Sequence, residues 1–116
     1  MAAAAIVAML VPVSALGHDR FTSGVTAGEV TSNSAIVWAR ASRQVAVRAR
    51  LATDVGFQNV VRQRILQASG ANDFTVQTSF GALSPNTTYH YQFCFLSGNP
   101  CSTKGRFVTA PSPSTP

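Results

Sequence analysis

The sequence predicts an all-β fold, a sandwich of about seven short strands packed as two sheets. From Phe21 onward, β-branched and aromatic residues alternate with polar ones in short segments, and no apolar pattern continues for long at helical spacing. Gly, Asn, Pro and Ser separate these segments and supply the residues that tight turns need. Many short strands joined by turns are typical of an antiparallel sandwich.

Seven segments carry this strand pattern. We expect strands at residues 24–30, 35–40, 45–53, 60–67, 74–80, 88–96 and 106–109. The connection at residues 53–59 is interpreted as holding one helical turn, capped by Thr53 or Asp54.

Two of the predicted strands indicate which of their faces is buried. In the third strand, one face carries only Val45, Val47, Ala49 and Leu51. In the sixth, an aromatic stripe of Tyr89, Tyr91, Phe93 and Phe95 alternates with other residues. Because side chains alternate between the two faces of a strand, each of these sets is predicted to point into the core.

Length and composition favour a single domain. The chain has 116 residues, of which 46% are hydrophobic and 11% are charged, so a compact core can form. The formal net charge of +5 would favour an anionic partner if the cationic residues cluster on the surface.

The two ends of the chain differ from its middle. Residues 1–17 hold an apolar run followed by small residues, as in a signal peptide, and the run is too short to cross a bilayer. We therefore expect export to the periplasm, the cell wall or the medium, with no membrane association after cleavage. Residues 18–110 then form the sandwich. Residues 111–116 contain three prolines and are interpreted as an extended linker.

Two cysteines, Cys94 and Cys101, flank the turn between the last two predicted strands. In an exported protein they would form a disulfide, whereas in a reducing compartment they would stay free thiols. They are too few for a structural zinc site unless both histidines also bind the metal.

The most specific local pattern runs from Leu83 through Pro85 to Tyr89, where a turn leads into the aromatic strand. It resembles the tyrosine corner of fibronectin type III and related sandwiches, in which the tyrosine hydroxyl bonds to the backbone of the preceding loop. Trp38, in the second predicted strand, occupies the place where such sandwiches bury a tryptophan between their sheets. An immunoglobulin-like or fibronectin type III-like sandwich is therefore expected.

Three stretches taken in order carry a more particular resemblance: residues 21–40, then Asn72-Asp-Phe-Thr-Val76 with residues 83–93, and then 105–111. They look like the N-terminal domain of the alkaline phosphatase D, or PhoD-like, family. The resemblance implies a front sandwich followed in the same polypeptide by a metal-dependent phosphatase domain. Its metal ions would be bound by that catalytic domain. Members of the family tend to carry a twin-arginine export signal, which this sequence lacks.

The chain itself has few side chains that could bind catalytic metals or act in catalysis. A two-metal phosphatase site needs several converging ligands, and the two histidines and four acidic residues are scattered as His18, Asp19, Glu29, Asp54, Asp73 and His90. No nucleophile elbow and no phosphate-binding glycine loop is present in the sequence. We expect neither catalytic nor metal-binding residues here, and no cofactor.

Four arginines occur as two pairs with strand spacing, Arg48 with Arg50 and Arg62 with Arg64. If their strands are neighbours, all four could lie on one outer face, as a docking surface for an acidic partner or polyanion. The alternative is an ordinary solvated face without a partner.

The sequence thus supports two hypotheses. The first is a non-catalytic accessory domain of a secreted PhoD-like alkaline phosphatase or phosphodiesterase, with the catalytic domain as its partner in cis and no specific nucleic-acid partner. The second is a free-standing secreted binding module for an anionic partner. An enzyme that acts through this chain alone ranks below both.

Overall fold

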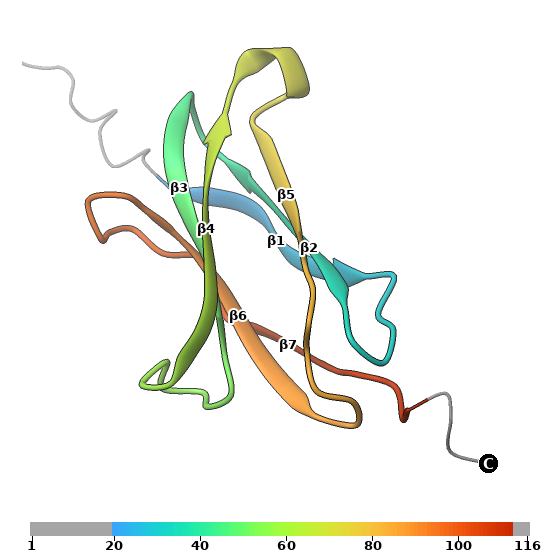
Figure 1. The fold of residues 1–116 in the computed structure, drawn as a ribbon. Coiled ribbons are helices and arrows are strands. Elements are labelled where there is room, and N and C mark those ends of the chain that lie inside the picture. The colour runs from blue at the N-terminus through green and yellow to red at the C-terminus, as the bar shows by residue number, and fades with distance from the viewer. Residues whose placement is uncertain (1–19, 113–116) are drawn as a thin grey trace, which may run out of the picture.

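The fold is a β-sandwich of two antiparallel sheets that pack face to face (Figure 1), described by a computed structural model for residues 20–112. One sheet has three strands in the order β1-β2-β5, and the other has four in the order β4-β3-β6-β7. The strands are β1 Phe21–Gly28, β2 Ala35–Ala41, β3 Val45–Ala52, β4 Val60–Ala68, β5 Thr75–Phe80, β6 Thr88–Phe95 and β7 Gly105–Val108. The predicted all-β class is confirmed.

The first strand starts earlier than predicted. β1 begins at Phe21, and its pairing with β2 is interrupted between Thr22 and Val25. The two extra residues, Ser23 and Gly24, have φ angles of 67° and 71°. This bulge lets Phe21 and Val25 both pair with inward positions of β2, Ala41 and Ala39. Gly24 therefore lies within a bulge and does not begin the strand.

The connection at residues 53–59 contains no helical turn, which corrects the prediction. Asp54 nevertheless behaves as a capping residue, because its carboxylate oxygens accept the backbone N–H groups of Gln58 at 3.0 Å and Asn59 at 2.8 Å. A short 3₁₀ turn occurs instead at Gly70–Asn72, where no helical structure was predicted.

The core lies between the inner faces of the two sheets. On β3, Val47, Ala49 and Leu51 are buried, as the alternation predicted. On β6, the aromatic stripe points inward, and its four rings are between 0% and 4% exposed. Small residues on β2, among them Ala35, Ala39 and Ala41, are also buried. Alanines on one sheet opposite rings on the other let the two layers approach closely.

One glycine is required by this packing. Gly105 of β7 lies opposite Tyr91 in the β6–β7 ladder. A Cβ atom at this position would lie within 2.6 Å of Cε1 of the Tyr91 ring, closer than any real contact allows. The aromatic stripe therefore limits the neighbouring strand to glycine at this position.

Trp38 is not buried between the sheets, so the prediction that it lies in the core is wrong. It lies on the outer face of β2, where it is partly exposed beside Thr26 and Gln77 on the neighbouring strands. Val37 and the other buried residues of β2 point to the opposite side of the strand, into the core. Arg40 shares the face of Trp38, and this charged neighbour was the signal in the sequence that the face is outward.

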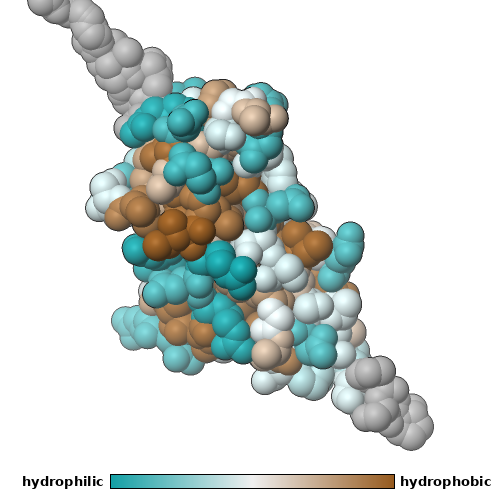
Figure 2. Space-filling view, turned by 45° about the horizontal axis from the view of Figure 1, so that its top comes forward, coloured by the Kyte–Doolittle hydropathy of each residue, from teal (hydrophilic) through white to brown (hydrophobic). Residues whose placement is uncertain are grey.

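The outer surface carries hydrophobic side chains in several groups with hydrophilic residues between them (Figure 2). The large exposed ones are Val55, Ile65, Leu96 and Val108. No helix within residues 20–112 is long and apolar enough to span a membrane.

Candidate functional site

The tyrosine corner forms as the Leu83-to-Tyr89 pattern predicts. The hydroxyl oxygen of Tyr89 accepts the backbone N–H of Ser84 at 2.9 Å, while the ring is buried. Leu83 is also buried, and its backbone N–H donates to the carbonyl of Asn33 at 2.9 Å. Pro85 is exposed in the turn. The corner thus ties the loop between β5 and β6 to both sheets.

A second hydroxyl, which no pattern in the sequence singled out, completes this corner. Thr109 is 2% exposed, and its Oγ1 donates to the carbonyl of Ser84 at 2.7 Å. The same oxygen accepts the backbone N–H of Thr87 at 2.9 Å. Tyr89 and Thr109 therefore hold the two backbone groups of one loop residue. A threonine just after the last strand carries no distinguishing pattern, so only the contact reveals its role.

The corner also determines where the chain leaves the sandwich. The backbone N–H of Ala110 donates to the carbonyl of Thr31 at 3.0 Å, and the carbonyl of Ala110 accepts the N–H of Asn86 at 2.9 Å. The segment after β7 is thereby held between the β1–β2 turn and the β5–β6 loop. The chain therefore leaves the sandwich at a point that is held by both loops.

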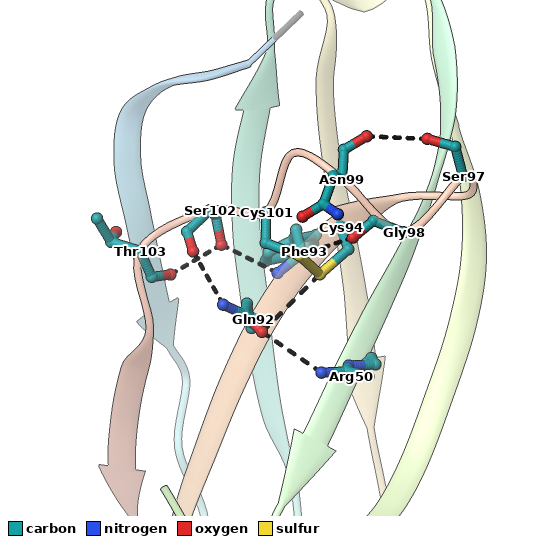
Figure 3. The surroundings of a disulfide bond; sticks show 10 residues. All are labelled: Arg50, Gln92, Phe93, Cys94, Ser97, Gly98, Asn99, Cys101, Ser102 and Thr103. Atoms are coloured by element: carbon teal, nitrogen blue, oxygen red, sulfur yellow. Dashed lines mark hydrogen bonds between the residues drawn. A yellow bond between two sulfur atoms is a disulfide. The ribbon is translucent and has the colours of Figure 1, made fainter. Parts of the chain in front are cut away.

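Cys94 and Cys101 form a disulfide, with an S–S distance of 2.08 Å, next to the turn between β6 and β7 (Figure 3). Ser102 supports the same turn, because its hydroxyl accepts the backbone N–H of Phe93 at 3.0 Å. Its carbonyl accepts the side-chain amide of Gln92 at 3.1 Å. The disulfide and these bonds join the start of the last segment to the end of the aromatic strand.

The four arginines do not share one face, which corrects the prediction. In the β3–β4 ladder, Arg64 lies opposite Ala49 and Arg62 opposite Leu51, both of which point inward. Residues directly opposite each other in a ladder point to the same side of the sheet. Arg62 and Arg64 therefore lie on the inner side of the edge strand β4, whereas Arg48 and Arg50 lie on the outer side of β3. The register, which the sequence does not reveal, separates the two pairs.

Arg62 joins the two sheets across the open edge. Its Nη2 donates to the carbonyl of Ala82 at 2.8 Å, and its Nε to the carbonyl of Gly81 at 3.3 Å. Both acceptors lie in the loop after β5, the edge strand of the other sheet. This arginine is therefore engaged with backbone groups and has a structural role.

Other cations join Arg48 and Arg50 on the outer side of the four-stranded sheet. Arg106 of β7 lies opposite His90, which points outward from β6. Lys104, just before β7, extends over the outer side, where its Nζ donates to the carbonyl of Val55 at 2.7 Å and lies 5.5 Å from the centre of the Phe57 ring. We call the surface formed by Arg48, Arg50, Lys104 and Arg106, with His90 between them, the basic face.

Arg50 lies at the centre of the basic face, and the hydrogen-bonding capacity of its guanidinium is only partly used. Its guanidinium lies 5.1 Å from the centre of the Phe57 ring, and its Nη2 approaches Oε1 of Gln92 at 3.5 Å. Its Nε is buried and has no hydrogen-bond partner. No other buried side-chain nitrogen or oxygen of residues 20–112 is in this state. A buried donor without a partner costs free energy, so this part of the basic face is not fully satisfied within residues 20–112.

The carboxylates of residues 20–112 form no ion pair with this face. Asp73 pairs with Arg40 at 2.9 Å beside the other sheet, and Glu29 lies at the end of β1. Asp54 is in the loop after β3, where the backbone N–H groups of Gln58 and Asn59 hold the pKa of its carboxyl below the usual value. Its oxygens accept hydrogen bonds from its own loop, and it forms no ion pair with a residue of the basic face.

Metal ligands do not gather in the part of the chain that the structure describes. No group of three or more His, Cys, Asp or Glu side chains within residues 20–112 could hold a metal ion. His90 lies on the basic face, next to Arg106. His18, Asp19 and the predicted signal peptide of residues 1–17 lie outside the described residues, as do the last four residues of the predicted linker.

Two packed antiparallel sheets with a tyrosine corner define a fibronectin type III-like sandwich, and solved structures of this kind are similar to it. The fn3 domain of the human collagen alpha-1(XX) chain matches with a TM-score of 0.53 and 25% identity, over 80% of this chain and 83% of that domain. The sensor domain of the anti-sigma factor RsgI4 of Pseudobacteroides cellulosolvens matches with a TM-score of 0.66 over 82% of this chain and 97% of that one. Its 14% identity shows a shared fold alone.

Within this class, the chain belongs to the family of PhoD-like phosphatase N-terminal domains, whose model matches residues 5–111. Alkaline phosphatase D of Bacillus subtilis (strain 168) is 29% identical over 104 residues, which cover 80% of this chain and 18% of that protein. The solved structure of PhoD matches with a TM-score of 0.73 and 27% identity, over 79% of this chain and 19% of that one. The chain thus spans about a fifth of the length of these relatives.

Proposed function

We propose that this chain is the accessory N-terminal domain of an exported PhoD-like alkaline phosphatase or phosphodiesterase, and that it contributes no catalytic group of its own. In this proposal its partner is a catalytic domain that follows in the same polypeptide and binds the metal ions. The observation that carries the proposal is the match to a phosphatase N-terminal domain over residues 5–111, which corresponds to about a fifth of each relative.

The anchored exit of the chain supports this role. The hydrogen bonds of Ala110 to Thr31 and Asn86 fix the start of the segment that would lead to the catalytic domain. A proline-containing segment resists bending, so this anchor would transmit the orientation of the sandwich to its neighbour. An accessory domain needs such a fixed junction if it is to shape the entrance of an active site.

Export is supported by two independent features. The apolar run of residues 1–17 has the pattern of a signal peptide. The disulfide between Cys94 and Cys101 would persist in an oxidising compartment. We therefore propose export to the periplasm, the cell wall or the medium.

Assays of the purified chain test the catalytic part of the proposal. The chain alone, with added calcium, iron or zinc, is expected to release no product from a chromogenic phosphodiester above the level of a chelator control. Turnover that chelator removes and metal restores would overturn the proposal. The reading frame beyond the codon for Pro116 tests the rest, because an in-frame continuation encoding Asp- and His-rich metal motifs is expected there.

A second candidate is a free-standing binding module for an anionic partner, and the basic face is the observation that favours it. A stop codon directly after Pro116, together with stable expression of the short protein, would select this candidate. Both candidates leave open what the basic face binds.

A further inference from the structure

We propose that the basic face is a binding surface for an extended polymer of phosphate groups, which it holds through the polymer's backbone. The face consists of Arg48 and Arg50 on β3, Arg106 on β7 and Lys104 just before it, with His90 between the two strands. The inference does not depend on a catalytic domain, since it concerns only side chains of the sandwich itself.

The spacing of the cations suits a linear ligand. Arg48 and Arg50 are two residues apart on one strand, which places their Cα atoms about 7 Å from each other. β6 separates β3 from β7, so Arg106 lies about 10 Å from β3. The cations therefore spread over an open sheet surface and do not converge on a single pocket. A flexible polymer can contact them in succession, whereas a single small anion cannot.

The charge of this face is not balanced within the described part of the protein. The ion pair between Arg40 and Asp73 lies on the other sheet. Close cations repel one another unless an anion meets them, so an anionic ligand would be attracted to this surface.

Three of the four lysine and arginine residues on the basic face are arginines, which favours phosphate. The guanidinium group presents parallel donors that match two phosphate oxygens, whereas ammonium acts as a point charge. A docked acidic protein would also need a central cluster of apolar or aromatic anchors. The large exposed apolar residues Ile65 and Val108 lie at opposite margins of the face, Ile65 one strand beyond Arg48 and Val108 two residues beyond Arg106, and they form no central cluster.

Recognition through bases is disfavoured because the face lacks stacking platforms. The rings of β6 and β7, which are Tyr89, Tyr91, Phe93, Phe95 and Phe107, are all buried. Phe57 is only 9% exposed, and Arg50 and Lys104 both lie against it. Proteins that hold single strands by their bases use exposed aromatic residues. The basic face would instead bind phosphates without regard to sequence.

A binding experiment with the purified chain tests the inference. The probe is a fluorescently labelled abasic oligodeoxynucleotide, which carries phosphodiester groups and no bases, and binding is followed by fluorescence anisotropy. The test variant is R48Q/R106Q. The matched control is R20Q/R64Q, which removes the same two charges from outside the basic face, with Arg64 on the inner side of the neighbouring strand. Thermal unfolding of each variant confirms that it is folded.

The salt dependence supplies the decisive measurement. Four phosphate contacts predict that the logarithm of the affinity falls with a slope of about −2.8 against the logarithm of salt concentration, or about 50-fold between 50 and 200 mM. R48Q/R106Q should lower the slope to about −1.4, or about sevenfold over the same range, while R20Q/R64Q keeps the native slope.

Three results would overturn the inference. The first is no binding of the abasic oligonucleotide at about 50 mM salt. The second is an equal loss in both double variants, which would show attraction by net charge alone. The third is competition by polyglutamate as effective as that by unlabelled abasic strand, which would identify an acidic protein as the partner. Because none of these assays involves turnover, their failure is distinct from failure of the proposed function.

Discussion

Replacing Tyr89 by Phe removes one oxygen atom from the tyrosine corner and leaves the ring in place. That oxygen accepts the backbone N–H of Ser84 at 2.9 Å, from a ring that is 4% exposed. Loss of a typical hydrogen bond costs about 1 kcal/mol, and a donor that water cannot fully reach costs more. Because Ser84 itself is exposed, we expect an intermediate loss of about 1.5 kcal/mol in the free energy of unfolding.

Thr109→Val should cost more than Tyr89→Phe. The hydroxyl that it removes is 2% exposed and serves both the carbonyl of Ser84 and the N–H of Thr87. With two part-buried backbone groups left without this partner, a loss of about 2 kcal/mol is expected. Because Tyr89 and Thr109 bind the same loop residue, the double variant should lose less than the sum, by about 0.5–1 kcal/mol.

Tyr91→Phe is the matched control. It removes the same atom from the same strand, and the Tyr91 hydroxyl has no hydrogen bond among the described residues. Its effect should stay within about 0.5 kcal/mol. Urea unfolding followed by near-UV circular dichroism gives all four free energies, and a loss of 1.5 kcal/mol corresponds to about 6–12 °C in the melting temperature. Equal effects of Tyr89→Phe and Tyr91→Phe, or full additivity with Thr109→Val, would refute the reasoning about the corner.

Three further predictions follow from the structure. Reduction of the disulfide between Cys94 and Cys101 should lower the free energy of unfolding by about 2 kcal/mol, measured by urea unfolding with and without reductant, and an unchanged midpoint would contradict it. Acrylamide should quench the fluorescence of Trp38, the single tryptophan, in the native protein, whereas resistance to quenching would place it back in the core. Burial raises the pKa of Tyr91 above 10.0, so its contribution to stability is complete below that pH and is lost as the pH rises through the folded-state pKa. The midpoint of urea unfolding should therefore fall less in Tyr91→Phe than in the native chain between about pH 9 and pH 11, and equal falls would argue against this origin.

The basic face shows how far sequence reasoning reached. The pairing of Arg48 with Arg50 on one outward face follows from alternation along a single strand, and the structure has them there. The addition of Arg62 and Arg64 required the register between two strands, and the structure excludes them from this face. Lys104 and Arg106 were not selected, because nothing local connects β7 with β3, which lies two strands away.

The amino-acid sequence by itself determined the strands, the buried aromatic stripe and the position of the tyrosine corner. All three depend on residues close together in the chain, where alternation and turn chemistry act directly. The tertiary structure alone decided that Trp38 faces outward, that Thr109 completes the corner and which cations share a surface. Each of these depends on which distant strand lies opposite and in which register, and a shift of one residue would reverse every face.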